Sequence, residues 1–224
     1  EAAAIDKLAR FRDLIAAATE RFNLTAVRDP EGIEQRHIVE VLALVALLER
    51  EGLLPAGAQV IDIGSGAGLP GIPVKMVRPD LHLTLLEANG KKCEFMREAI
   101  EALDIEDALV VEGRAEAIAH APEHRAAYDL VLARAVAPLP VLLEYALPFL
   151  RIDGRLVATK GSAAPREVEA SEHALAELGG RLQALVPFEP PAGMTQTLAV
   201  IVKTAATPDR YPRRVGVPSK RPLV

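Results

Sequence analysis

The sequence contains one cysteine, Cys93, and no apolar run near the roughly 18 residues that a bilayer-spanning helix needs. A single cysteine cannot form an intrachain disulfide or a zinc cluster, so neither a disulfide nor a bound metal is expected. A signal-peptide pattern is also missing. These absences predict a cytoplasmic protein that does not associate with membranes.

The net charge of −5 disfavours a nucleic-acid partner at first sight, but the charge is unevenly distributed along the chain. Residues 203–224 contain six Lys or Arg residues against the single acid Asp209, which gives this segment +5 and leaves −10 for the remainder. A basic tail on an acidic body is typical of an arm that contacts phosphates. The alternative is a solvated terminus without a partner.

The first 52 residues predict a helical extension. Apolar residues from Ile5 to Phe22 recur at three- and four-residue spacing, which indicates a helix over residues 1–22. Asp29-Pro30 resembles a helix start, with Asp29 as the cap, and the second helix is expected to run to about Arg50.

From residue 53 to 204 the pattern alternates between strand and helix, which predicts a mostly parallel sheet covered by helices on both faces. The last two strands have no helix between them and predict an antiparallel hairpin appended to this sheet. Residues 205–224 are rich in proline and basic residues and form the predicted tail. The expected strands are Gln59–Ile63, His82–Glu87, Ala108–Glu112, Tyr128–Ala133, Arg155–Thr159, Leu182–Phe188 and Gln196–Lys203; the expected helices cover about 70–78, 90–103, 115–120, 138–150 and 165–178.

A glycine-rich turn follows the first strand, where an open α/β sheet binds its ligand. Its spacing is G-x-G-x-G, and Leu69 stands where the dinucleotide fingerprint has its third glycine. The G-K-[ST] end of a phosphate-binding P-loop is missing. Asp62 precedes the turn by two residues; its carboxylate would repel a pyrophosphate and would suit a cationic amine.

Two further positions complete the pattern of an adenosyl site. Glu87 ends the second strand, 23 residues after Gly64, where a carboxylate can accept hydrogen bonds from both ribose hydroxyls. The third strand is followed by Gly113-Arg-Ala-Glu116, and Glu116 or a nearby backbone amide can read an adenine edge. An adenosyl ligand without phosphates is expected, and S-adenosylmethionine, with S-adenosylhomocysteine as product, is the natural candidate.

These residues resemble one family, the bacterial 16S rRNA guanine-N7 methyltransferases known as RsmG or GidB. The resemblance rests first on Asp62-Ile-Gly-Ser-Gly-Ala-Gly-Leu-Pro-Gly-Ile-Pro73 and extends over nearly the whole chain. Many members follow the His-Ile pair with Asp-Ser-Leu, whereas this chain has Val39-Glu40-Val41. Further matching segments are Asn23-Leu-Thr25, Arg36-His-Ile38, Leu83–Glu87, Lys91-Lys92 with Phe95, Gly113–Glu116, Tyr128-Asp129, Arg134–Ala137, Lys160-Gly161, Tyr211–Arg214 and Gly216–Lys220.

The resemblance implies a class I S-adenosylmethionine-dependent methyltransferase fold. This is a Rossmann-like, mostly parallel seven-stranded sheet that ends in an antiparallel hairpin, with helices before it. It also implies that Arg134 lies beside the methionine end of the cofactor. Residues and resemblance together predict cofactor contacts from Asp62, Gly64, Ser65, Gly66, Gly68, Leu69, Glu87, Ala115, Glu116 and Arg134.

The expected chemistry needs no general base, and none is assigned. A C5 methyltransferase needs a cysteine nucleophile, but Cys93 falls in a predicted helix rather than after the fourth strand. An amine methyltransferase commonly has Asn/Asp-Pro-Pro-aromatic in that loop, where this chain has Arg134-Ala-Val-Ala-Pro138. Guanine N7 has a lone pair and no proton, so the protein contributes alignment and electrostatics.

Basic residues are the candidates for the RNA and its target base. Lys91 and Lys92 start a helix, where positive charge is mildly unfavourable, and this mismatch favours a phosphate contact. His37 has an equally good interpretation as a core or capping residue. The candidate set is Arg36, His37, Lys91, Lys92, Arg134, Lys160, Arg213, Arg214 and Lys220.

The expected partner is 16S rRNA in the small subunit or its precursor, and the expected state is a monomer. Three alternatives stay open. They are a methyltransferase acting on another RNA, a protein or a small molecule; a nicotinamide-dependent oxidoreductase with the same sheet; and an RNA-binding assembly factor without turnover.

Overall fold

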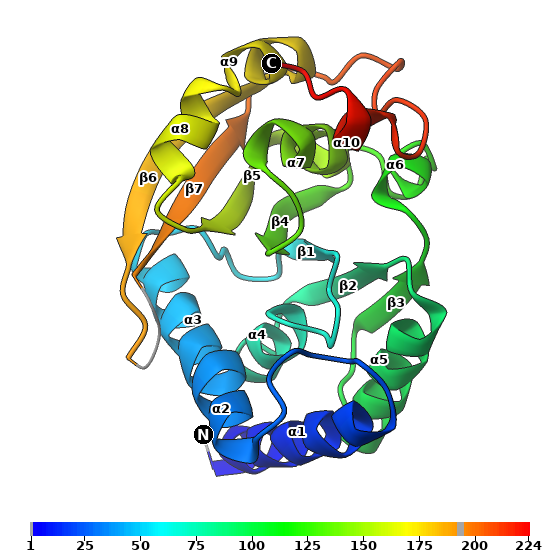
Figure 1. The fold of residues 1–224 in the computed structure, drawn as a ribbon, viewed down its shortest axis with the longest axis vertical. Helices are drawn as coiled ribbons and strands as arrows, with labels where there is room; N and C mark the ends of the chain where they lie inside the picture. Colours follow the sequence, from blue (N-terminus) through cyan, green and yellow to red (C-terminus); the bar gives the residue numbers. More distant parts are fainter. Residues whose placement is uncertain (1, 192–194) are drawn as a thin grey trace.

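A computed structural model describes residues 2–191 and 195–224 of the protein. A central sheet separates two groups of helices, and the two chain termini lie toward opposite ends of the long axis (Figure 1). The N-terminal helices gather at one end, and the C-terminal segment with its short helix lies beside α6 and α7 at the other.

The sheet has seven strands in the order β3-β2-β1-β4-β5-β7-β6. The first five strands are parallel, and β7 pairs antiparallel with both β5 and β6. Strand order reverses between β1 and β4, and that switch point is where open α/β sheets bind ligands. The strands are β1 Gln59–Ile63, β2 His82–Glu87, β3 Ala108–Glu112, β4 Tyr128–Arg134, β5 Leu150–Lys160, β6 Gly180–Phe188 and β7 Gln196–Lys203.

The alternation of side chains along the strands builds one hydrophobic core on each face of the sheet. Val60 packs into the core beneath the N-terminal helices, while its neighbour Ile61 packs on the opposite face with α7 and α9. The helices are α1 Ala2–Arg21, α2 Pro30–Ile33, η1 Glu34–Val39, α3 Glu40–Arg50, α4 Gly71–Val77, α5 Gly90–Ala102, α6 Ala115–Ile118, α7 Leu139–Ala146, η2 Leu147–Phe149, α8 Ala164–Glu169, α9 Glu172–Leu178 and α10 Val217–Lys220.

The N-terminal helices pack on the sheet rather than standing apart from it. Phe11 of α1 is fully buried and stacks on Phe95 of α5, with ring centroids 6.4 Å apart. Asp29 caps α2 as the sequence predicts, since its carboxylate accepts a 2.6 Å hydrogen bond from the Gly32 amide. The second predicted helix is continuous in space but contains a π-helical segment, η1, which the sequence did not indicate.

Two helix boundaries differ from the prediction. The helix expected over 138–150 ends at Ala146, because Pro148 lacks an amide proton and cannot continue an α-helix. The strand after it consequently starts at Leu150 and not at Arg155. The helix expected over 165–178 is divided at Ala170 and Ser171, where the Ser171 hydroxyl donates to the Glu167 carbonyl.

The basic C-terminal segment is folded onto the body, unlike the arm that the sequence predicted. Glu144 of α7 is fully buried and accepts hydrogen bonds from the backbone amide, Nε and Nη2 of Arg213, at 2.7, 2.9 and 2.6 Å. Further along, the Gly216 amide donates to the Glu116 carboxylate at 2.9 Å. Sequence spacing could not reveal this docking, because each partner lies at least 69 residues away in the chain.

We expect Arg213→Ala to destabilise the fold, because it leaves the buried Glu144 carboxylate without its cation. Removing one partner of a buried ion pair costs about 3 kcal/mol or more. Urea unfolding would measure the loss. The adjacent Arg214 is exposed, so Arg214→Ala is the matched control and should change the free energy of unfolding by less than about 0.5 kcal/mol. Equal losses of stability in the two variants would contradict a stabilising role for the ion pair between Arg213 and Glu144.

Candidate functional site

The glycine-rich turn lies at the carboxyl end of β1, beside the switch point. Gly64, Gly66 and Gly68 have φ of +67°, +60° and +79°, a left-handed backbone that glycine adopts without strain. A Cβ added at Gly66 would meet only the Gly64 carbonyl oxygen, at 3.9 Å, so a ligand can approach this backbone closely. Ser65 and Leu69 are buried and support the turn, with the Ser65 hydroxyl donating to the Asp62 carbonyl at 2.7 Å.

Asp62 is buried beneath this turn. Its Oδ2 accepts a 2.9 Å hydrogen bond from the Gly71 amide, and its Oδ1 is buried without a hydrogen-bond partner among the described residues. Burial raises the pKa of Asp62 to about 7. A cationic amine would supply the missing hydrogen bond and charge, so the donor set fits the amino acid end of an adenosylmethionine ligand.

Glu87 is held against the glycine turn at the end of β2. Its Oε2 accepts from the Gly66 amide at 3.0 Å, and its Oε1 accepts from the Ala88 and Asn89 amides at 2.8 and 2.9 Å. A carboxylate offers about four acceptor positions, so this one can still accept from a hydroxyl. The position beside Gly66 fits the ribose contact that the sequence predicted.

The turn after β3 contributes differently from its sequence expectation. Ala115 starts α6 and is half-buried, whereas Glu116 is buried and its Oε1 accepts from Gly216 of the C-terminal segment. The Glu116 carboxylate therefore holds that segment in place. The sequence predicted that Glu116 or a nearby backbone amide would bind the edge of an adenine ring. Because Glu116 is already bound to Gly216, the backbone amides of this turn fit that role better.

Arg134 ends β4 and connects the sheet to the N-terminal helices. Its Nη1 donates to the Arg36 carbonyl at 3.2 Å and to Glu40 Oε1 at 3.3 Å, and its Nη2 donates to His37 Nδ1 at 3.0 Å. These three acceptors lie within η1 and at the start of α3. π-helical segments are rare and frequently occur at functional sites.

His37 is buried behind Arg134 as a neutral imidazole. Burial and the nearby Arg134 charge lower the pKa of His37 to about 4. An arginine can only donate, so Nδ1 is the acceptor and Nε2 carries the proton that is donated to Thr25 Oγ1 at 2.8 Å. His37 therefore orients Arg134 from behind. It is a buried core residue, one of the two interpretations from the sequence, and it also contacts a residue that lines the cavity.

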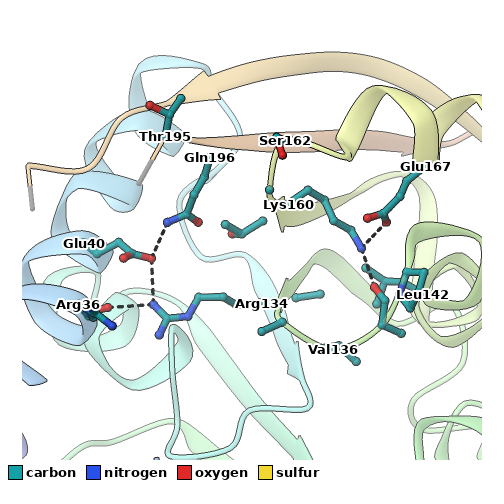
Figure 2. Close-up of a pocket in the computed structure, with 16 residues that line it drawn as sticks. Arg36, Glu40, Arg134, Val136, Leu142, Lys160, Ser162, Glu167, Thr195 and Gln196 are labelled. Atoms are coloured by element: carbon teal, nitrogen blue, oxygen red, sulfur yellow. Dashed lines mark hydrogen bonds and ion pairs between the residues drawn. The ribbon is translucent and has the colours of Figure 1, made fainter. Parts of the chain in front are cut away.

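A cavity of about 1110 Å³ opens at the carboxyl ends of β4 and β5. Figure 2 shows Arg36, Glu40 and Arg134 on one side of it and Lys160 with Glu167 on the other. Its lining contains the loop that follows β4, from Ala135 to Pro138, but neither the glycine turn nor Glu87. The cavity and the glycine turn are thus neighbouring but separate parts of the strand ends, and Arg134 lines the cavity.

Lys160 holds the loop after β4 in place. Its Nζ donates to the Ala137 carbonyl at 2.6 Å and pairs with Glu167 Oε2 at 2.9 Å. The same Glu167 oxygen accepts from the Leu139 amide at 2.6 Å. Lys160 lines the cavity as predicted, and its ammonium group is bound by the Ala137 carbonyl of this loop and by the Glu167 carboxylate of α8.

The remaining predicted RNA residues lie outside this cavity. Lys91 and Lys92 lie at the start of α5, where the Asn89 side chain caps their amides, and Lys91 is exposed. Arg214 and Lys220 are exposed on the C-terminal segment, while Arg213 is engaged by Glu144. The structure therefore brings together Arg36, His37, Arg134 and Lys160 and leaves the other five elsewhere on the molecule.

Among the charged and amide side chains that line the cavity, Glu40, Glu167 and Gln196 were not predicted site residues. Glu40 had a visible signal, because it is an acid at the start of an otherwise apolar run and departs from the family pattern. Gln196 had none, since its partner Glu40 lies 156 residues away, and the contact of Glu167 with the Leu139 amide spans 28 residues.

Within 2–191 and 195–224, no cluster of three or more His, Cys, Asp or Glu side chains is arranged to hold a metal ion. No helix in these ranges is long and apolar enough to cross a membrane. Cys93 is buried in α5 with its Sγ 3.3 Å from the Glu87 carbonyl, and it does not line the cavity after β4.

The sequence over residues 4–192 matches the family described as "GidB: rRNA small subunit methyltransferase G". A relative named "Ribosomal RNA small subunit methyltransferase G" from Roseiflexus castenholzii is 45% identical over 220 residues, covering 98% of this chain and 92% of that protein. The protein of the same name from Deinococcus deserti is 44% identical and covers 98% and 88%, respectively.

Solved structures show the same fold at low sequence identity. A SAM-dependent methyltransferase from Aquifex aeolicus superposes with a TM-score of 0.57 at 18% identity, covering 79% of this chain and 99% of that one. A variant of MtNAS in complex with S-adenosylmethionine gives a TM-score of 0.60 at 17% identity, covering 91% and 72%. The chain therefore belongs to the rRNA small subunit methyltransferase G family, a family of S-adenosylmethionine-dependent methyltransferases, and it has the fold of such enzymes.

Proposed function

We propose that this protein transfers a methyl group from S-adenosylmethionine to N7 of one guanine in the 16S rRNA of the small ribosomal subunit. Family membership supports the enzyme class and the ribosomal substrate. A small-subunit substrate would also place the reaction in the cytoplasm. The guanine N7 target rests on the resemblance and on the chemistry of the cavity after β4.

The cofactor would occupy the glycine turn between Asp62 and Glu87. When bound, S-adenosylmethionine supplies a methyl group on a positively charged sulfur. Asp62 Oδ1 would accept from its amino group, Glu87 would accept from the ribose, and the open backbone at Gly66 would lie against it. Arg134 would border the methionine end and separate it from the acceptor cavity.

The observation that carries the N7 assignment is that, among the described residues, each acid that lines the cavity after β4, and His37 behind it, is engaged by a basic side chain. Glu167 is paired with Lys160, Glu40 with Arg134, and His37 Nδ1 accepts from Arg134. None of these groups is placed as a free general base. Guanine N7 has a lone pair and no proton, so its methylation needs alignment and no base, which matches this cavity.

RNA contacts are proposed for the exposed basic residues around the site. Arg36 lies at the cavity mouth, Lys91 at the start of α5, and Arg214 and Lys220 on the folded C-terminal segment. Contacts of this kind to phosphates weaken as salt rises. A splayed nucleotide could then enter the cavity after β4, since sequence-specific RNA recognition targets unstacked bases.

The decisive experiment is transfer of a labelled methyl group from S-adenosylmethionine to small-subunit particles that lack the modification. We expect label in a single 16S guanine, at which borohydride and aniline treatment cleaves the chain. Label at another atom or in another RNA would overturn the N7 assignment and keep the methyltransferase. Binding of cofactor without any transfer would favour a protein or small-molecule substrate, or a non-catalytic factor.

Glu87→Ala should weaken cofactor binding by on the order of 1–3 kcal/mol, because charge-assisted hydrogen bonds to the ribose are lost. Calorimetric titration with S-adenosylhomocysteine measures this change directly. Glu101, exposed in α5, provides the control; Glu101→Ala should leave the affinity unchanged. If Glu87→Ala and Glu101→Ala bind S-adenosylhomocysteine with equal affinity, Glu87 does not contact the ribose.

Asp62→Asn should separate ligand binding from stability. The pKa of Asp62 is about 7 when folded against 3.8 ordinarily, so its contribution to stability is present below pH 3.8 and is lost as pH rises to about 7. The variant lacks this loss, so at pH 8 its free energy of unfolding should equal or exceed that of the wild type. Its affinity for S-adenosylhomocysteine should fall by about tenfold or more, because a neutral amide loses the charge-assisted part of the hydrogen bond to the ammonium. Urea unfolding at pH 6 and 8 with calorimetry tests both; undiminished affinity contradicts the amine contact.

A further inference from the structure

Glu40 is the acidic residue at the centre of the cavity wall formed by Arg36, Glu40 and Arg134. It is the first residue of α3, directly after the π-helical segment, and its side chain is only 11% exposed. Its Oε1 accepts hydrogen bonds from Arg134 Nη1 at 3.3 Å and from Gln196 Nε2 at 3.2 Å. Three separate elements, α3, β4 and β7, thus fix the position of this carboxylate (Figure 2).

The second oxygen of Glu40 is available to a ligand. Among residues 2–191 and 195–224, Oε2 has no hydrogen-bond partner, although Glu40 lines the cavity. Among the described residues Asp62 Oδ1 is the one fully buried side-chain oxygen without a partner, so Glu40 Oε2 is open to the cavity, and a donor that enters the cavity can bind it. Two donors already hold Oε1, which fixes the direction of the remaining acceptor positions.

Arg134 has donor capacity left as well. A guanidinium carries five N–H groups, and three of them donate to Arg36, Glu40 and His37. The remaining two can donate to an oxygen in the cavity. An acceptor carboxylate and a donor guanidinium therefore stand side by side, held by a direct ion pair.

This pair complements the edge of a guanine. Around the rim of that base, N7 is followed by the acceptor O6 and then by the donors N1–H and N2–H₂. If N7 faces the cofactor side of Arg134, O6 comes next to the guanidinium and the two donors come next to Glu40. Adenine would instead present an amine to Arg134 and an unprotonated N1 to Glu40, and both contacts are unfavourable.

We propose that Glu40 is a specificity-determining residue that accepts hydrogen bonds from N1–H and N2–H₂ of the target guanine, with Arg134 donating to O6. This assignment rests on the proposed function, since it takes guanine N7 as the methyl acceptor. Flipped bases are commonly read by hydrogen bonds to this edge. The competing interpretation is that Glu40 only positions Arg134 and does not touch the base.

A change of the base at the target position separates the two interpretations. Inosine retains N7, O6 and N1–H of guanine and lacks only the 2-amino group. Small-subunit particles would be reconstituted with 16S rRNA carrying guanine or inosine at the methylated position, and kcat/KM for methyl transfer measured on both. We expect the wild type to prefer guanine by about 10- to 100-fold, the loss that follows when a buried acceptor loses its donor.

Glu40→Gln is the test variant, because the amide keeps the size of the side chain and one acceptor. We expect it to lower activity on guanine particles and to reduce the preference for guanine over inosine by about tenfold. A role confined to positioning Arg134 would lower activity on both particles by the same factor, and that result would overturn the proposal. A wild type that does not distinguish guanine from inosine would overturn it as well.

Glu34→Gln is the matched control, since Glu34 precedes Glu40 in the same continuous helix but pairs with Arg12 outside the cavity. Glu34→Gln should keep the wild-type preference for guanine over inosine. Because all variants are measured on the same two kinds of particle, an effect of inosine on particle assembly would be the same for each of them. Calorimetry with S-adenosylhomocysteine and thermal melting should show that Glu40→Gln is folded and binds cofactor. Failure of the proposed function is recognisable separately, because the wild type would then place no label at N7 of either base, and the proposal would fall with it.

Discussion

The ion pair between Arg134 and Glu40 is the contact on which the cavity after β4 depends. Arg134 comes from the central sheet and Glu40 from the N-terminal helices, so their pairing fixes the extension relative to the strand ends. His37 completes the arrangement as a neutral acceptor behind the guanidinium, with Thr25 holding its other nitrogen. The extension therefore forms part of the cavity wall, to which it contributes Arg36 and Glu40.

Antiparallel β7 explains how a residue late in the chain reaches the same wall. Parallel strands deliver their carboxyl ends to the ligand edge, whereas an antiparallel strand delivers its beginning. Gln196, the first residue of β7, thus lies beside Glu40. Lys203, the last residue of β7, lies at the opposite end of the strand. The terminal hairpin therefore extends the sheet and also contributes a residue to the cavity wall.

The sequence was sufficient for the features that depend on local periodicity. Four of the seven strands, β1, β2, β3 and β7, have the predicted bounds, because each contains a short run of apolar residues that stands out in the sequence from the segments around it. The glycine turn, Asp62 and Glu87 were also placed correctly at adjoining strand ends. Local patterns could not show the π-helical segment, the pairing of Glu40 with Gln196 across 156 positions, or the docking of Arg213 on Glu144. The last two are tertiary contacts between polar groups, which leave no periodic signal, and the π-helical segment shares its apolar pattern with the α-helix around it.

The hydrogen bond between Gly216 and Glu116 ties the last segment of the chain to the turn after β3. That turn is also the place where the adenine ring of the proposed cofactor would lie. Any ligand that stabilises one arrangement of this turn must stabilise the attached segment by the same coupling free energy, because linkage is reciprocal. Loss of the segment would in turn loosen the ligand. With a cofactor at this turn, the C-terminal segment and the ligand would be thermodynamically coupled, although Glu116 and Gly216 are a hundred residues apart in sequence.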